Sequence, residues 1–329
     1  MKTYMGIAGL CALLMCGCSQ SASTEMSEPS ANEPVQIVLK GGIATSAVQS
    51  QPASRAVIDN NYASPLTVAF ARLDQETGGT WPDYSTLSSS LEATMQKGEG
   101  DWTIAFTNPQ YYLSRNTNNN TRLVGWYPTG SLSNGTVSFT INGWTDIMLT
   151  QELEGNKTDG NRFGEDGKSF TFKHLLTRIN VKAYAADAAA ATAWGTITAN
   201  SIVLKNQSTS CTVELPSTVA FGNENTDLTL PLKQVADDAT ITYPITLPVG
   251  QESAAECGYA MIRPMEGSSS LTLTVTTSKG GTYEITAPFT SGCEAGSAYD
   301  LYLKFTATGI EPTATISAWT DGDDVEVVL

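Results

Sequence analysis

Apolar and polar residues alternate with a period of two along most of this 329-residue chain. In the segment 299–305, for example, the odd positions hold Tyr, Leu, Leu and Phe, whereas Asp, Tyr and Lys stand between them. An apolar face opposite a polar face is what a half-buried antiparallel strand requires. The alternation therefore predicts an all-β protein, with strands at 35–39, 66–70, 137–141, 179–183, 271–275 and 299–305.

Turn residues separate these strand segments. Lys279–Thr282 holds two glycines between alternating runs, which predicts a tight hairpin. Two segments, 87–97 and 183–193, have helix-forming composition, and the second is rich in alanine. Neither carries a strong apolar stripe, so we expect both to be short helices that connect strands.

The number and spacing of the strands predict β-sandwich architecture. The chain is too long for one small sandwich, and a loop rich in Gly, Asp and Asn at 155–167 divides it into nearly equal parts. We therefore expect two β-sandwich domains in tandem, the first over 35–165 and the second over 166–329.

The first residues read as a targeting segment. Lys2 precedes a short apolar stretch at 5–15, which is too brief to cross a bilayer. The sequence Leu14-Met15-Cys16-Gly17-Cys18 is similar to the lipobox of bacterial lipoproteins. On that interpretation residues 1–17 are a signal peptide, Cys18 carries a diacylglycerol and, on its amine, a further acyl chain such as palmitate, and 18–34 form a flexible tether. The alternatives are cleavage before Cys16 and an ordinary secretory signal cut elsewhere.

The charge balance limits the function classes. With 33 acidic and 18 basic residues the formal net charge is −15, which argues against nucleic acid as a partner. A single histidine, His174, argues against most zinc sites and histidine-based catalysis, and its strand context predicts a packed or capping side chain. No motif for a cofactor or a metal stands out. Nor does any serine lie in a GxSxG elbow, so an extracellular hydrolase is the least favoured function.

After removal of a signal peptide and acylation of Cys18, three cysteines remain, and none belongs to a CxxC pair. We expect buried free thiols, and a single disulfide is the alternative. The three are Cys211, Cys257 and Cys293.

Three stretches together resemble a known family. They are Arg55-Ala56 with the strand that ends at 69–73, the segment 172–181, and the segment 299–305 followed by 316–327. With a lipobox in front, they resemble the fimbrillin-like lipoproteins of Gram-negative anaerobes, which include type V pilins and their anchor and tip relatives. The resemblance implies two transthyretin-like sandwiches, no enzymatic activity, and a place at the outer-membrane surface or in a fimbrium.

The resemblance also implies how such a subunit assembles. An arginine-specific surface protease cuts the exported lipoprotein, an N-terminal strand leaves, and a strand of another pilin subunit fills the exposed groove. Applied to this sequence, the resemblance implies that Arg55 is the processing site and that the removable strand holds Val35, Ile37 and Leu39. The donated strand is the C-terminal segment that alternates Val325, Val327 and Leu329.

Other interpretations of these residues stay open. The segment 35–39 would equally serve as a permanent first strand, Arg55 as a surface arginine, and 325–329 as part of the chain's own sheet. A stalk, a tip and an anchor subunit all fit the sequence. A different function, a monomeric surface lipoprotein that binds host or bacterial glycans, would use an aromatic cluster that otherwise belongs to the core: Trp102, Tyr111, Tyr112, Trp126 and Tyr127.

Overall fold

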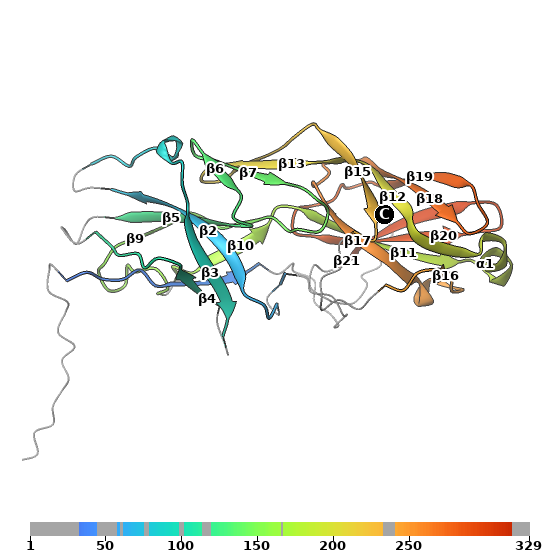
Figure 1. The fold of residues 1–329 in the computed structure, drawn as a ribbon, viewed down its shortest axis with the longest axis horizontal. Helices are drawn as coiled ribbons and strands as arrows, with labels where there is room; N and C mark the ends of the chain where they lie inside the picture. The colour runs from blue at the N-terminus through green and yellow to red at the C-terminus, as the bar shows by residue number, and fades with distance from the viewer. Residues whose placement is uncertain are drawn as a thin grey trace, which may run out of the picture.

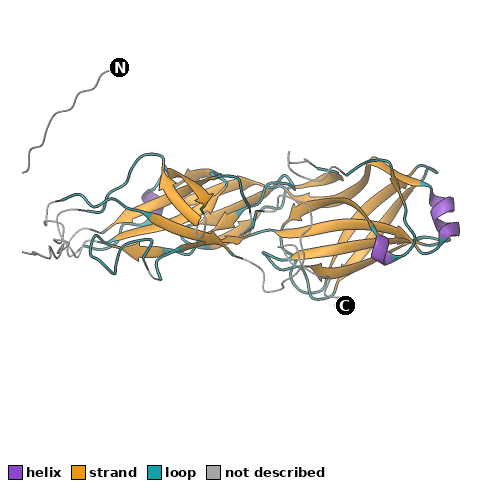
Figure 2. Cartoon of the chain, turned by 90° about the horizontal axis from the view of Figure 1, so that it is seen from below, coloured by secondary structure: helices purple, strands orange, loops and turns teal. Residues whose placement is uncertain are grey.

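The protein is elongated, with two strand-rich lobes placed one after the other along its long axis (Figure 1, Figure 2). The computed structural model describes residues 33–44, 58–59, 62–75, 79–98, 102–113, 120–165, 167–232 and 241–317. Within these ranges, helix is confined to α1 (Ala188–Trp194) and two short 3₁₀ turns, η1 (Tyr84–Thr86) and η2 (Gln251–Ser253). The predicted fold class, all-β with two sandwich units in tandem, is confirmed. Across the described ranges no helix is both long and apolar enough to cross a membrane.

The N-terminal lobe is built on a sheet that closes on itself. Its first strand, β2, pairs with β3 on one side and with β5 on the other, so the sheet curls into a ring and leaves β9 outside it. In spatial order the strands are β2 (Leu66–Asp74), β3 (Leu91–Lys97), β4 (Trp102–Phe106), β1 (Leu39–Ile43), β10 (Phe170–His174), β8 (Met148–Leu149), β5 (Thr121–Tyr127) and β9 (Leu153–Gly155).

A second sheet covers this lobe and links the two halves of the sequence. It pairs β7 with β13 in antiparallel register, so a hairpin from beyond residue 200 returns to the N-terminal lobe (Figure 1). That pairing crosses the domain boundary predicted at 165/166, which stays a prediction. The strands of this sheet, in order, are β14 (Thr218–Phe221), β13 (Ser210–Glu214), β7 (Thr136–Thr140) and β6 (Ser131–Ser133).

The C-terminal lobe packs two further sheets face to face, and β16 (Ile245–Thr246) pairs beside β12. One sheet has the order β17 (Ala255–Ile262), β11 (Thr177–Ala185), β20 (Ala298–Phe305), β21 (Ile310–Ser317). The other has the order β15 (Asn225–Leu230), β12 (Thr196–Ser208), β18 (Ser269–Thr277), β19 (Thr282–Phe289). The predicted hairpin is confirmed, because β18 and β19 pair in continuous register around Lys279–Thr282.

One of the two expected helices is confirmed and the other is wrong. Asp187 caps α1, accepting a hydrogen bond from the backbone of Ala190 at 2.8 Å, although 183–185 belong to β11. The segment 91–97 is instead strand β3, in which Ala93 and Met95 are buried and their neighbours Glu92, Thr94 and Gln96 are exposed. There the period-two burial overrides the helix propensity of the single residues.

Cys211, Cys257 and Cys293 are buried thiols outside any disulfide, as expected. Burial raises the pKa of both Cys211 and Cys293 to about 12, so these two thiols stay protonated and unreactive at neutral pH.

The interior of the ring is an aromatic core centred on Phe70 of β2. Its ring meets Phe106, Phe170 and Phe172 edge-on at centroid distances of 5.6, 5.2 and 6.3 Å. Gly125, opposite Phe70 on β5, leaves room for the ring, because a Cβ there would stand 2.5 Å from it. The alternate residues of β2 point outward into a second core, beneath the sheet that carries β7 and β13. Both faces of β2 are therefore buried.

Replacing Phe70 by alanine should lower the free energy of unfolding by about 3–5 kcal/mol, because the rigid ring leaves a cavity. The matched control is Val38→Ala, since Val38 is 61% exposed and its truncation should cost less than about 0.5 kcal/mol. Urea denaturation of both variants checks this, and equal losses would contradict the position given to Phe70.

Candidate functional site

The N-terminal segment 35–43 is part of the ring, between two strands that are remote from it in sequence. Strand β1 pairs antiparallel with β4, where Leu39 faces Ile104, and parallel with β10, where Ile43 faces Phe172. Ahead of β1, the Ile37 N–H donates to the carbonyl of Gln110 at 2.8 Å. The segment thus has backbone partners on both sides and separates β4 from β10.

The side chains of this segment alternate as the sequence predicts. Ile37, Leu39 and Ile43 are at most 3% exposed and enter the core of the ring, and Val35 packs at its margin. Val38, between them, is 61% exposed. The hydrogen-bonded strand begins at Leu39, later than predicted, because 35–37 pair with the loop at 110–112 and not with β4. The three residues assigned to the removable strand therefore do lie together on one buried face.

Gly41 stands where β4, β1 and β10 meet. It pairs with Trp102 on one side and with Phe170 on the other. A Cβ at this position would lie 2.7 Å from the Ile104 side chain and 2.9 Å from the carbonyl oxygen of Phe170. The small residue therefore allows the segment to sit between its two neighbours.

Arg72 on β2 supports the loop that holds the start of the segment. Its guanidinium donates to the carbonyl oxygen of Tyr111 at 2.8 Å and to the Gln110 side-chain oxygen at 3.3 Å, and it pairs with Asp74 at 2.9 Å. Neither Arg72 nor Gly41 was predicted from the sequence as a site residue. The alternation of Arg72 with Asp74 was a local signal for a same-face ion pair, but nothing local indicated the loop it contacts.

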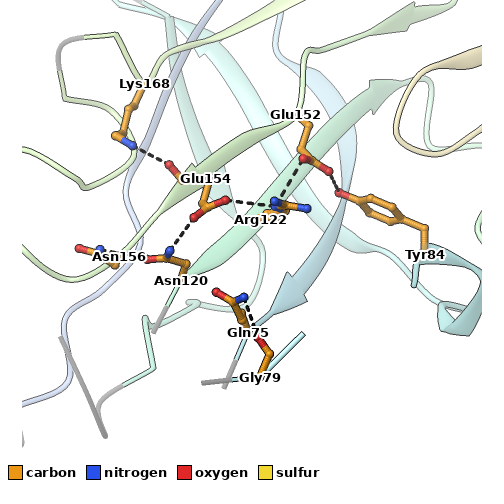
Figure 3. Close-up of polar contacts among 9 residues, drawn as sticks. All are labelled: Gln75, Gly79, Tyr84, Asn120, Arg122, Glu152, Glu154, Asn156 and Lys168. Atoms are coloured by element: carbon orange, nitrogen blue, oxygen red, sulfur yellow. Dashed lines mark hydrogen bonds and ion pairs between the residues drawn. The ribbon is translucent and has the colours of Figure 1, made fainter. Parts of the chain in front are cut away.

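A polar cluster on the same lobe fastens β9 to β5 (Figure 3). Arg122 lies 3.2 Å from a Glu154 oxygen and 3.5 Å from a Glu152 oxygen, and the Tyr84 hydroxyl donates to Glu152 at 2.6 Å. Burial and this hydrogen bond raise the pKa of Tyr84. Trp81 completes the cluster, with the Arg122 guanidinium 4.0 Å from its ring centroid. Because these groups engage one another, we interpret the cluster as structural.

His174 is a packed histidine, as predicted. Its Nδ1 lies 2.5 Å from an Asp146 oxygen, and both side chains are almost fully buried. Within the described parts of the chain, no group of three His, Cys, Asp or Glu residues has the geometry to hold a metal ion.

The aromatic residues considered as a glycan platform are divided between core and surface. Trp102, Tyr112 and Trp126 are at most 4% exposed and belong to the interior, whereas Tyr111 is 46% exposed. Tyr112 stacks on Phe163 at a centroid distance of 5.8 Å, and burial raises its pKa to about 12. These residues therefore do not form a common exposed face.

Several predicted site residues lie outside the described residues. They are Cys18, Arg55, Val325, Val327 and Leu329, and their roles stay predictions. Among the described residues, the structure brings Val35, Ile37 and Leu39 together.

Comparison with known proteins identifies the family. A family model described as fimbrillin-like matches residues 59–319, and the chain belongs to this family. No curated protein sequence matches it. Among solved structures, a candidate cell adhesion protein of Bacteroides uniformis is similar at a TM-score of 0.56 and 16% identity, covering 87% of this chain and 99% of that one.

A second solved structure, a candidate cell adhesion protein of Bacteroides ovatus, aligns with a TM-score of 0.53 and 16% identity, covering 89% of this chain and 99% of its own. At such identities the two structures show a shared fold.

Replacing Gly41 by alanine should lower the free energy of unfolding by about 1–3 kcal/mol, because the added methyl group overpacks the junction of β4, β1 and β10. Gly309→Ala is the matched control, since a Cβ there would have no atom within 4 Å. Thermal and urea unfolding measure both. A Gly41→Ala protein as stable as the control would contradict the tight seating of the segment.

Proposed function

We propose that this protein is a fimbrial subunit or a pilus-associated adhesin, exported as a lipoprotein and assembled by protease-triggered strand exchange. One observation carries the proposal: a short N-terminal segment completes the ring, while the connection that follows it contains Arg55. A cut in that connection would leave the segment held only by noncovalent contacts. Membership of the fimbrillin-like family supports the same function.

Loss of the segment would expose two strand edges and an apolar groove at once. β4 and β10 would lose their backbone partners, and unpaired edges readily bind another strand. Burying Ile37, Leu39 and Ile43 contributes about 5–9 kcal/mol before ordering costs, so the groove would strongly favour an incoming strand with the same alternation. Backbone hydrogen bonds would add affinity, and the side-chain pockets would add specificity.

The incoming strand would come from another pilin subunit, either a second copy or a related chain. In this sequence the segment with matching alternation is Val325, Val327 and Leu329 at the C-terminus. We propose it as the donated strand.

The lipid at Cys18 would hold the uncut precursor at the outer membrane. The cut at Arg55 removes the lipid together with the segment, so a subunit that is cut joins the polymer and one that stays uncut remains an anchor. Processing would thus separate an anchor subunit from the stalk and tip subunits.

Arg55→Ala should abolish processing and polymerisation. Treatment of the wild-type protein with an arginine-specific protease should first cut after Arg55 and then give a ladder of oligomers on denaturing gels loaded without boiling. The matched control is Arg263→Ala, because Arg263 is an exposed arginine on the C-terminal lobe. This variant should be cut and should form the ladder of oligomers as the wild type does. A ladder that persists in Arg55→Ala would remove this residue from the mechanism.

Cys18→Ser should abolish lipid attachment. Cells of a Gram-negative anaerobe that express the protein and are fed labelled palmitate should label the wild type and Cys16→Ser, but not Cys18→Ser. Label retained by Cys18→Ser and lost from Cys16→Ser would move the lipid to the earlier cysteine.

A further inference from the structure

An ion pair on the C-terminal lobe joins two neighbouring strands that lie far apart in sequence. The Lys182 Nζ of β11 contacts the Asp300 Oδ2 of β20, across a sequence separation of 118 residues. The two strands are parallel, and Asp300 is the partner of Asn180, two residue pairs before the level of Lys182, whose own partner is Tyr302. The Asp300 side chain is 3% exposed and that of Lys182 is 19% exposed.

Two further groups lie on the face of the sheet that carries this pair. The Asn180 side-chain amide donates to Asp300 Oδ1 at 2.8 Å. Glu256 of β17 is the partner of Lys182 in the antiparallel ladder, and directly paired residues project to the same face of a sheet. An amine, a carboxylate that it contacts, a second carboxylate and an amide donor are thereby brought to one place on three adjacent strands.

Aromatic side chains make the surroundings of the pair less aqueous. The Tyr302 ring centroid lies 5.4 Å from Lys182 Nζ, and Tyr184 packs edge-on against Tyr302 at 6.5 Å. Tyr302 itself is 5% exposed. The rings and the burial of Asp300 limit the access of water to the pair, and excluding water favours condensation over hydrolysis.

From this arrangement we propose that Lys182 and Asp300 condense into an intramolecular amide, which covalently links β11 to β20. Proton transfer within the pair gives a neutral amine and a carboxylic acid. The amine nitrogen attacks Cγ of Asp300, and the Cγ–Oδ2 bond breaks. The nitrogen loses two protons in all, and both leave with Oδ2 as one water molecule. Ammonium and carboxylate thus become an amide and water, with atoms and charge balanced and no oxidant required.

The neighbouring groups have defined roles in this step. The Asn180 amide donates to Oδ1, the oxygen that stays, and stabilises the negative charge that develops there during attack. Glu256 is the positioning and proton-shuttling residue, which takes a proton from Nζ and returns one to the departing oxygen.

Peptide mapping of the purified full-length protein tests the proposal. We expect a branched peptide joining the segments that contain Lys182 and Asp300, at their summed mass less one water. Intact mass should agree: after correction for the substitution, Lys182→Arg should be heavier than the wild type by one water. Recovery of Lys182 and Asp300 in separate linear peptides, at the intact mass of the open chain, would overturn the proposal.

The same experiment has an internal control and a test of mechanism. Lys205 contacts Asp227 in a similar ion pair, but those side chains are 32% and 41% exposed, so their peptides should remain linear. Glu256→Gln should fold and should lose the branched peptide or form it at least tenfold more slowly. Full cross-linking in Glu256→Gln would leave the amide intact and remove Glu256 from its formation.

Discussion

The arrangement of the N-terminal lobe depends on one short strand hydrogen-bonded along both of its edges. β1 joins β4 to β10, and without it the ring would be open at that point. Its departure would leave two rows of backbone donors and acceptors unpaired and would open the pockets of Ile37, Leu39 and Ile43 to water. A lobe built in this way would lose stability if nothing filled the gap. The proposed exchange would therefore replace the segment with an equivalent strand, because its simple removal would be costly.

The C-terminal lobe meets a different requirement in the proposed polymer. Its central strands β11 and β20 run parallel, and the chain returns through most of the lobe between them. A subunit in a fibre must transmit tension without unfolding. An amide between Lys182 and Asp300 would tie the first strand of this sandwich to its neighbour and limit how far the lobe extends if it opens. The N-terminal lobe would then provide strand exchange, and the C-terminal lobe would provide resistance to tension.

The sequence predicted local structure well and distant pairing poorly. The β18–β19 hairpin could be predicted because its signal is contained in consecutive residues. The insertion of β1 beside β10, and the return of β13 to pair with β7, join residues far apart in sequence, and period-two alternation does not specify the partner.

Burial was underestimated where both faces of a strand are covered. Alternation along 299–305 predicted a half-buried strand, yet Asp300 is only 2% exposed. The shared buried face of Val35, Ile37 and Leu39 could be predicted from the sequence. The roles of Gly41 and Arg72 could not be predicted, because they depend on the strands and the loop that surround these residues.

The most direct test of the central claim is to lock the segment in its groove and then cut the chain. Lys40 of β1 is paired with Thr103 of β4, and both are exposed, so Lys40→Cys with Thr103→Cys places two thiols across the pair. After cleavage at Arg55, we expect the oxidised double variant to stay monomeric and to form oligomers only when a reductant is added. Oligomers of equal size and yield with the disulfide intact would show that the segment need not leave, and would contradict strand exchange at this groove.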